Sequence, residues 1–415
     1  MELLNFIEKA PTAFQAVREM RNLLCEAGAI ELCESDPWEL QQNQDYFVVK
    51  NDSALLSFRI PENCGSFHIY AAHSDSPSFK IKENPEIVVE NAYVKLNVER
   101  YGGMLMSTWF DRPLSVAGRV IVGRDGKPES IPVNVDRDLL MIPNLAIHMN
   151  REANDGYKYN AQKDLLPLFG GIDAKGTFMK TVAEWAGVSE QEILGHDLFL
   201  YPRVKPVVWG ADNEYISAPR IDDIECAYAG FQGFLKGEKK SAISVFCMFD
   251  NEEVGSSSIQ GAGGMFLSDT LLRISEALSD TEEQRIRRLS ESFLISADNG
   301  HALHPNYPEK CDPTNRPKLN EGILLKYSAN LRYTTDGKSA AKLKLLAKKA
   351  GVPLQIFFNR SDMMGGSTLG NISLSQVPVH SVDIGLPQLA MHSAYETAGV
   401  KDYANLLKLT ETFFA

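Results

Sequence analysis

The chain has 415 residues, of which 44% are hydrophobic and 23% charged, so its composition is that of a globular protein with a large core. An excess of 54 Asp and Glu over 42 Lys and Arg gives a net charge of −12, and the basic clusters at 285–288 and 342–349 lie in helical patterns, so we expect no nucleic-acid partner. No apolar run is long enough to cross a bilayer, and residues 1–20 lack the basic start of a signal peptide. The six cysteines form no CxxC pair. These observations predict a cytoplasmic protein without a membrane partner.

The first half of the chain combines a helical pattern with many strand-like runs. Residues 4–27 carry apolar side chains at helical spacing. Three short strand-like runs follow at 46–49, 54–60 and 67–72. Residues 86–205 then contain alternating segments separated by Gly, Pro and Asp-Gly turns, with one helical segment near 176–187. This stretch is typical of antiparallel β structure.

From residue 206 onward, apolar strands alternate with amphipathic helices. The predicted strands are 243–249, 293–297, 354–358 and 377–384, and the predicted helices are 223–236, 265–278, 338–350 and 400–413. This alternation predicts an α/β fold with a mixed central sheet and helices on both faces. Because the run at 67–72 is of the same strand type, we expect 1–85 and 206–415 to form one domain, into which 86–205 is inserted as a β-rich domain.

Side chains able to bind metal ions follow the predicted strands of the larger domain. In open α/β sheets, ligands bind at the carboxyl ends of the strands. The candidate residues at these ends are His73, Asp75, Asp250, Glu252, Glu253, Asp298, His301, Asp362 and, further along the chain, His392. Carboxylates and imidazoles are the ligands of catalytic zinc and similar divalent ions. The chain has no glycine-rich phosphate loop and no GxSxG elbow, so its chemistry points to metal.

The spacing of His73 and Asp75 favours a metal site over two unrelated structural residues. A lone histidine after a strand more often packs in a core than binds a metal, and a lone aspartate there is a common turn residue. An extended backbone, however, places positions 73 and 75 on the same side of the chain. The carboxylate of Asp75 can then hold the imidazole of His73 from behind, as carboxylates do for many metal-binding histidines.

Two acidic pairs, Glu252–Glu253 and Asp222–Asp223, each have a structural and a chemical interpretation. Adjacent glutamates are usually solvated, but this pair closely follows an apolar strand. Neighbouring side chains point in different directions, so one glutamate can bind an ion while the other reaches water. One of the two aspartates could instead cap a helix. Asp298 and His392 taken singly fit either interpretation, and only the joint arrangement is specific.

Segments in a fixed order over the whole chain carry a resemblance to a known family. The segments are AAHSDSPSFKIK at 71–82, IPNLAIH at 142–148, SAPRIDD at 217–223, FDNEEVGSS at 249–257, HPNY at 304–307 and PQLAMHS at 387–393. In these segments the chain resembles the aspartyl aminopeptidase family of dinuclear zinc metallo-aminopeptidases. The combination of several long motifs makes chance agreement a poor explanation.

The resemblance implies a role for each residue of the strand-end cluster. The implied metal ligands are His73, Asp222, Glu253, Asp298 and His392, and Asp222 would bridge two ions. Glu252 would be the general base and Asp75 would support His73. His148 would reach the site of a neighbouring subunit. The implied cofactors are two divalent metal ions per chain, zinc in the first place, with cobalt or manganese as substitutes.

The resemblance also implies a fold, an activity and an assembly. The family has an α/β catalytic domain with an inserted β domain used for assembly, and twelve copies form a shell with the sites inside. Its activity is the removal of the amino-terminal residue from short peptides, with Glu252 taking a proton from a water held between the two ions. We therefore expect short peptides with a free amino terminus and further copies of this chain, as a homododecamer, as partners.

The segment after residue 359 departs from the family pattern. Relatives have RND-x-PCG where this chain has RSDMMGG, and the segment borders the substrate pocket in relatives. Arg360, Asp362 and Gly366 are therefore predicted to contact substrate, although Asp362 also fits a structural cap. Arg360 would favour an acidic first residue, whereas Met363 and Met364 would favour an apolar one, because methionine packs adaptably. Both preferences stay open.

Two other functions fit part of the pattern. A dinuclear zinc deacylase or a carboxypeptidase-type amidohydrolase would share the ligands but would need a basic receptor for a carboxylate, for which Arg220 and Arg360 are candidates. An inactive, shell-forming relative is the second alternative. The complete ligand set and the intact Glu252 argue against it.

Overall fold

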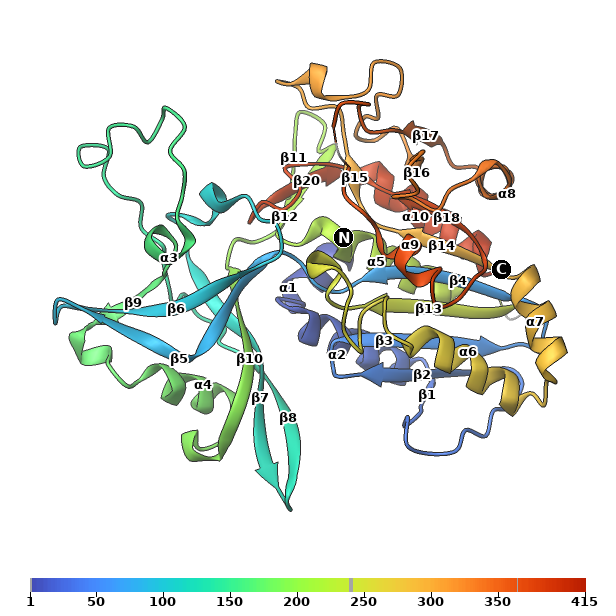
Figure 1. Cartoon of the computed structure of the whole chain (residues 1–415), viewed down its shortest axis with the longest axis horizontal. Coiled ribbons are helices and arrows are strands. Elements are labelled where there is room, and N and C mark those ends of the chain that lie inside the picture. The colour runs from blue at the N-terminus through green and yellow to red at the C-terminus, as the bar shows by residue number, and fades with distance from the viewer. Residues whose placement is uncertain (1, 239–241, 364) are drawn as a thin grey trace.

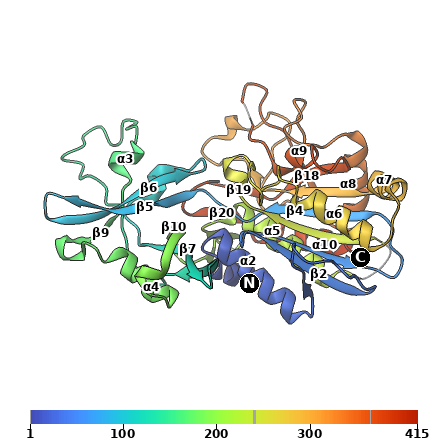
Figure 2. The ribbon, with the colours of Figure 1, turned by 60° about the horizontal axis from the view of Figure 1, so that its bottom comes forward.

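The computed structural model describes residues 2–238, 242–363 and 365–415 and contains three β-sheets in this part of the chain. A nine-stranded sheet covered by helices forms one side of the molecule, and a six-stranded sheet extends from it on the other side (Figures 1 and 2). A five-stranded sheet lies near the junction between them (Figure 1). This architecture confirms the predicted α/β fold with an additional β-rich part.

The central nine-stranded sheet is mixed, as predicted. Its strands, in spatial order, are β1 (Ile30–Glu31), β2 (Gln44–Lys50), β3 (Ala54–Ile60), β13 (Ile243–Phe249), β4 (Phe67–His73), β14 (Phe293–Ala297), β18 (His380–Gly385), β16 (Ile323–Lys326) and β17 (Leu354–Phe357). The middle strands β13, β4, β14 and β18 are parallel, whereas β3 and β16 join them in the antiparallel direction. Every residue of β13 and β14 is buried, which explains why these strands form continuous apolar runs in the sequence.

Helices cover both faces of the central sheet. One hydrophobic core joins its first face to α1 (Glu2–Lys9), α2 (Ala13–Glu26), α5 (Ile221–Lys236), α8 (Gly337–Ala350) and α10 (Val400–Phe413). A second core joins the other face to α6 (Phe266–Ala277), α7 (Glu282–Glu291) and α9 (Leu369–Ser373). Among the described residues, no helix combines the length and the apolar character that a membrane span requires. The predicted cytoplasmic location stays a prediction.

The two remaining sheets follow a different plan. The six-stranded sheet is antiparallel and has the order β8 (Lys127–Asn134), β7 (Leu114–Arg124), β10 (Ile193–Pro202), β5 (Ser78–Val89), β6 (Tyr93–Tyr101) and β9 (Leu168–Gly171). It shares its own core with α4 (Phe178–Ala186), and α3 (Ala161–Asp164) lies at its edge beside β6. The five-stranded sheet has the order β11 (Val207–Trp209), β12 (Tyr215–Ala218), β20 (Glu396–Gly399), β19 (Pro387–Leu389) and β15 (Gly300–His301). The division of the chain into two domains at 86–205 stays a prediction.

The structure differs from the predicted secondary structure in several details. The single helix predicted over 4–27 is two helices, α1 and α2, because Pro11 lies between them and cannot donate a backbone hydrogen bond within a continuous helix. Strand β5 begins at Ser78, before the predicted start of the β-rich stretch. The elements that were not predicted include helix α7, which buries none of its residues, and strand β16, which has only four residues.

Gly230 allows α5 to pack closely on the central sheet. A Cβ atom at this position would lie 2.0 Å from a carbon of the Tyr70 ring on β4. We therefore expect Gly230→Ala to lower the free energy of unfolding by about 1–3 kcal/mol through overpacking. Gly337→Ala on α8 is the matched control, because nothing lies within 4 Å of the added carbon there. Urea denaturation compares both variants with the wild type, and equal stabilities for all three would contradict this packing.

Candidate metal centre

The carboxyl ends of the middle strands bring the predicted ligands to one edge of the central sheet. β4 ends at His73, and Asp298 directly follows its parallel neighbour β14. On the other side of β4, the parallel strand β13 is followed by a short 3-10 helix, Glu252–Val254, that carries both glutamates. His392 follows β19. Because the ends of neighbouring parallel strands meet at one edge, residues far apart in the sequence come together here.

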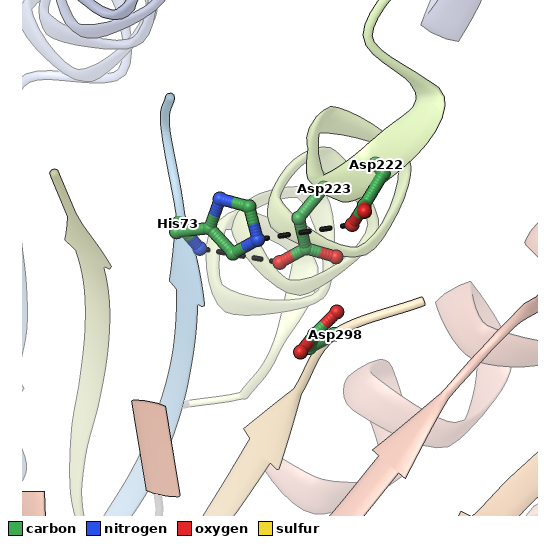
Figure 3. Close-up of side chains that lie close together, drawn as sticks. All are labelled: His73, Asp222, Asp223 and Asp298. Carbon is green, nitrogen blue, oxygen red and sulfur yellow. Dashed lines mark hydrogen bonds and ion pairs between the residues drawn. The ribbon is translucent and has the colours of Figure 1, made fainter. Parts of the chain in front are cut away.

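One group of potential ligands consists of His73, Asp222, Asp223 and Asp298 (Figure 3), with one ligand atom of each residue within 4.8 Å of the others. His73 Nε2 lies 3.7 Å from Asp222 Oδ1, and the backbone N–H of His73 donates to Asp223 Oδ2 at 3.2 Å. Both aspartates are buried at the start of α5, and the peptide bond between them is cis. Arg220 precedes α5, but Asp222 and Asp223 both have non-helical backbone angles at a kink in its first turn, so the interpretation of one aspartate as a helix cap stays a prediction.

A second group lies on the other side of Asp222. His392 Nε2 is 3.3 Å from Asp222 Oδ2 and 3.4 Å from Glu253 Oε1. Asp222 therefore belongs to both groups and turns one carboxylate oxygen toward His73 and the other toward His392. A third set of close ligand atoms joins His73 to Glu252 and Glu253. The structure thus brings the five predicted ligands and Glu252 into one continuous cluster.

The cluster concentrates buried negative charge. Burial raises the pKa of Glu252 to about 8 and that of Asp298 to about 6, and neighbouring carboxylates add to both shifts. Burial also raises the pKa of Glu253. For His73, burial disfavours the charged imidazolium, but Asp75 and other carboxylates around it raise its pKa well above the usual value. These raised pKa values have one cause: the cluster holds more buried carboxylates than the nearby positive charges balance.

The residues present fit a divalent cation. Asp222 Oδ1 and Glu253 Oε1 are buried and have no hydrogen-bond partner among the residues that the structure describes. Leaving such an oxygen without a partner costs on the order of 1–3 kcal/mol or more, a penalty that a bound cation removes. Two imidazoles combined with several carboxylates are the donor set of catalytic zinc sites. The cluster is therefore well suited to bind zinc.

Asp75 contacts three residues of this cluster and one tyrosine outside it. Its Oδ1 lies 3.4 Å from His73 Nδ1 and accepts the backbone N–H of Glu252 at 3.1 Å. Its Oδ2 accepts the backbone N–H of Glu253 at 3.2 Å and the hydroxyl of Tyr101 at 2.7 Å. One carboxylate therefore connects a histidine of the central sheet, both glutamates and a tyrosine of the six-stranded sheet.

His392 is held by two groups that sequence analysis missed. Its Nδ1 lies 2.6 Å from the carbonyl oxygen of Gly103, two residues after the end of β6 at Tyr101. The buried carboxylate of Glu396 accepts the backbone N–H of His392 at 2.6 Å and that of Asp222 at 3.0 Å. Tyr101 at the end of β6 thus contacts Asp75, which lies beside His73, and the turn after β6 contacts His392 directly. The sequence signals are modest: a Tyr-Gly-Gly turn after a strand, and a glutamate four residues after His392.

Tyr101→Phe tests whether the hydrogen bond from Tyr101 to Asp75 affects metal binding. The variant removes one hydroxyl and keeps the ring. We expect the affinity for zinc to fall roughly tenfold, because groups that hold a ligand in place contribute 10–100-fold to affinity or activity. Competition with a coloured chelator measures this affinity. Tyr93→Phe is the matched control, since Tyr93 lies on the same strand and is exposed. Equal zinc affinity of the two variants would contradict a supporting role for Tyr101.

Lys326 is a buried cation beside the cluster, at the end of β16, and it too was missed. Its Nζ donates to the backbone carbonyl of Asn299 at 2.8 Å and lies 3.8 Å from Asp298 Oδ2. Burial disfavours the charge of Lys326, but Asp298 and other nearby groups raise its pKa above the usual value. Lys326 therefore balances part of the negative charge at Asp298. A lysine at the end of the apolar run ILLK was its only signal in the sequence.

The residues predicted to contact substrate lie outside the cluster. Arg360 and Asp362 form an ion pair with each other at 2.8 Å on the loop after the edge strand β17. Gly366 is exposed in the same segment, whereas Met364 lies outside the described residues. His148 is exposed in a loop between β8 and α3. Their roles stay predictions.

The two arginines considered as carboxylate receptors have other partners. Arg220 donates through Nε to the carbonyl of Ala10 at 3.0 Å and through Nη2 to that of Ile7 at 2.9 Å, next to the end of α1. Arg360 is paired with Asp362, as described above. The structure therefore offers no support for the deacylase or carboxypeptidase alternative from either arginine.

Comparison with known proteins gives a consistent result. Residues 6–414 match the family described as aminopeptidase I zinc metalloprotease (M18). A probable M18 family aminopeptidase 2 from Clostridium novyi is 45% identical over 422 residues, which cover 100% of this chain and 98% of that protein. A protein of the same description from Pseudomonas fluorescens (strain SBW25) is 39% identical over 422 residues, with 100% and 97% covered.

Solved structures show the same fold. The Ape4 and Nbr1 complex contains a chain that superposes with a TM-score of 0.96 at 33% identity, covering 100% of this chain and 84% of that one. The S. cerevisiae mApe1 dodecamer gives a TM-score of 0.87 at 27% identity, with 100% and 95% covered. These matches confirm the family predicted from the motifs at the level of M18. The chain belongs to the M18 family of zinc aminopeptidases.

Proposed function

We propose that this aminopeptidase works with two metal ions that share Asp222. The proposal is supported by the position of Asp222, whose two carboxylate oxygens face different histidines, His73 at 3.7 Å and His392 at 3.3 Å. Two-metal sites hold their ions ~3.5–4 Å apart, which is a distance that one bridging carboxylate can span. The main support for the proposal is that Asp222 belongs to two groups of potential metal ligands.

The ligands divide between two sides of Asp222. His73 and Asp298 would hold one ion, and Glu253 and His392 would hold the other. Zinc is the family's metal, and cobalt or manganese would suit the same nitrogen and oxygen donors. When bound, such ions polarise a peptide carbonyl and lower the pKa of water.

Glu252 would move protons during hydrolysis. Its backbone N–H donates to Asp75, and one of its carboxylate oxygens lies close to ligand atoms of His73 and Glu253. We infer that this carboxylate takes a proton from the attacking water and passes it to the amine of the leaving peptide. A positioned carboxylate in this role contributes about 10²–10⁴-fold to the rate.

The proposed substrates are short peptides with a free amino terminus and an acidic or apolar first residue. A panel of aminoacyl-p-nitroanilides tests this choice of substrates. The panel is assayed with and without a chelator, and N-acetylated amino acids are assayed in parallel. We expect hydrolysis of free-amine substrates only, abolished by chelation and restored by zinc. Hydrolysis of the N-acetylated compounds instead would overturn the proposal. Within the panel, the ratio of aspartyl to leucyl hydrolysis decides between the two preferences.

We propose that the chain assembles into a homododecamer, with 1–85 and 206–415 as the catalytic domain and 86–205 as the assembly domain. The six-stranded sheet has its own core, and the M18 relative mApe1 forms a dodecamer. The loop that carries His148 exposes Leu145, Ile147 and Met149, an apolar group that suits a contact with another copy. His148 would then complete the site of a neighbouring subunit.

Mixing two inactive variants tests the role of His148 in a neighbouring site. Glu252→Gln and His148→Ala should each lose most activity alone. If His148 acts in a neighbouring subunit, mixed oligomers contain some sites with both residues intact, and they should regain roughly a quarter of wild-type activity at equal amounts. The measurement is peptide hydrolysis after the two variants are mixed under conditions that exchange subunits. Persistent inactivity of oligomers shown to be mixed would place His148 and Glu252 in the same chain's site.

A further inference from the structure

Asn299 directly follows the proposed ligand Asp298, and it is almost completely buried, at 2% exposed. It lies between the end of β14 and the start of β15, at the place where Figure 3 shows Asp298 opposite the two aspartates at the start of α5. A neutral amide is neither a base nor one of the usual ligands of zinc. The hydrogen bonds of Asn299 indicate a different role.

Three buried side chains occupy the whole amide group of Asn299. Its Nδ2 donates to Gln388 Oε1 at 2.8 Å and to Glu225 Oε2 at 3.3 Å. Its Oδ1 accepts from Cys226 Sγ at 2.8 Å. All three partners are buried. Both N–H donors and the carbonyl oxygen of the amide are therefore used.

The three partners belong to chain segments that carry two other proposed ligands. Glu225 and Cys226 lie on α5, three and four residues after Asp222. Gln388 lies on β19, four residues before His392. One buried amide thus connects both segments to the end of β14, where the third proposed ligand lies.

The backbone around Asn299 is held by separate contacts. Its carbonyl oxygen accepts from the buried Nζ of Lys326 at 2.8 Å. β15 begins at the next residue and pairs with β19, and the Gly300 N–H donates to the Leu386 carbonyl at 2.9 Å. A Cβ atom at Gly300 would lie 2.6 Å from a carbon of Leu324, so this turn packs closely on β16. A side-chain variant of Asn299 leaves these main-chain bonds in place and removes only the connection to α5 and Gln388.

We propose that Asn299 is a positioning residue, which holds Asp222, Asp298 and His392 at the spacing that the metal centre requires. The inference rests on the ligand set proposed above. Without the amide, α5 and β19 could shift relative to the end of β14, and the ligand atoms would lose their common geometry. Groups that hold a metal ligand in place contribute about 10–100-fold to affinity or activity.

Asn299→Leu tests this role, because leucine has the same branching as asparagine but no hydrogen-bonding atoms. We expect zinc to bind roughly 10–100-fold more weakly, measured by competition with a chelator. We also expect the cobalt-saturated variant to differ from the wild type in its visible absorption spectrum, which reports the geometry of the ligands. Asn63→Leu is the matched control, since Asn63 is exposed in the loop between β3 and β4, and it should keep wild-type values.

The affinity and the spectrum separate positioning from a merely structural role. A structural role would lower the free energy of unfolding but leave the zinc affinity and the cobalt spectrum of the folded variant unchanged, and that result overturns the proposal. If Asn299→Leu does not fold, Gln388→Met takes its place, because it removes one acceptor with little change in length. This variant should weaken zinc about fivefold, and an unchanged affinity would then overturn the proposal.

Asp298→Asn, measured in the same assay, separates failure of this inference from failure of the ligand set. It replaces a proposed ligand itself and should weaken zinc. If Asp298→Asn weakens zinc and a folded Asn299→Leu does not, the role of Asn299 alone is wrong. If Asp298→Asn leaves the zinc affinity unchanged, the ligand set is wrong and the inference fails with it.

Discussion

Glu252→Gln is expected to reduce kcat by about 10³-fold while the protein keeps its metal. The carboxamide has nearly the shape of the carboxylate but cannot accept a proton, and loss of a general base removes about 10²–10⁴-fold of rate. Glu253, Asp222 and both histidines stay in place in this variant, so the ligand set is complete. The measurements are kcat on an aminoacyl-p-nitroanilide and the zinc content of the same preparation.

Two results separate this role from a structural one. Glu283→Gln, an exposed glutamate on α7, is the matched control and should keep wild-type kcat. If Glu252→Gln instead loses zinc in proportion to its activity, Glu252 acts as a ligand. If the fully loaded variant keeps full activity, Glu252 has no part in the chemistry.

Asp222→Asn is expected to weaken zinc at both positions together. An amide oxygen is a poorer ligand than a carboxylate, and Asp222 belongs both to the group with His73 and Asp298 and to the group with Glu253 and His392. The loss of affinity should exceed the roughly 10–100-fold that removal of a supporting group causes. Zinc competition with a chelator of known affinity measures both binding steps, and activity should fall in parallel.

The control for this variant is the same substitution, Asp to Asn, at a position away from the cluster. Asp269→Asn lies in the first turn of α6 and is exposed, so zinc binding should stay at the wild-type level. A wild type that binds two ions, combined with an Asp222→Asn variant that loses only one, would assign Asp222 to a single ion and contradict the bridge.

The strand-end ligands could be predicted because their signals are local. His73 ends β4 and Asp298 follows β14, and both strands are short apolar runs that are visible in the sequence. General rules for parallel sheets then place their carboxyl ends together. Where the strand lies at the edge of the sheet, the same reasoning does not bring the residue into the cluster: Asp362 after β17 pairs with Arg360, and its contact with substrate stays a prediction.

Other parts of the site could not be predicted from local pattern because they depend on tertiary packing. Asp223 contacts the backbone of His73 across 150 residues, and this contact exists only because α5 packs against β4. Tyr101 comes from a different sheet, and Glu396 from β20 of the five-stranded sheet. The family resemblance, not the pattern of residues, predicted that Asp222 is a shared ligand.

A zinc titration of metal-free protein tests the two-ion centre most directly. Zinc is added in steps to chelator-treated protein, and bound zinc and peptide hydrolysis are measured in the same samples. The shared position of Asp222 predicts two bound ions per chain, with full activity only after the second is bound. Saturation of both binding and activity at one ion per chain would contradict it.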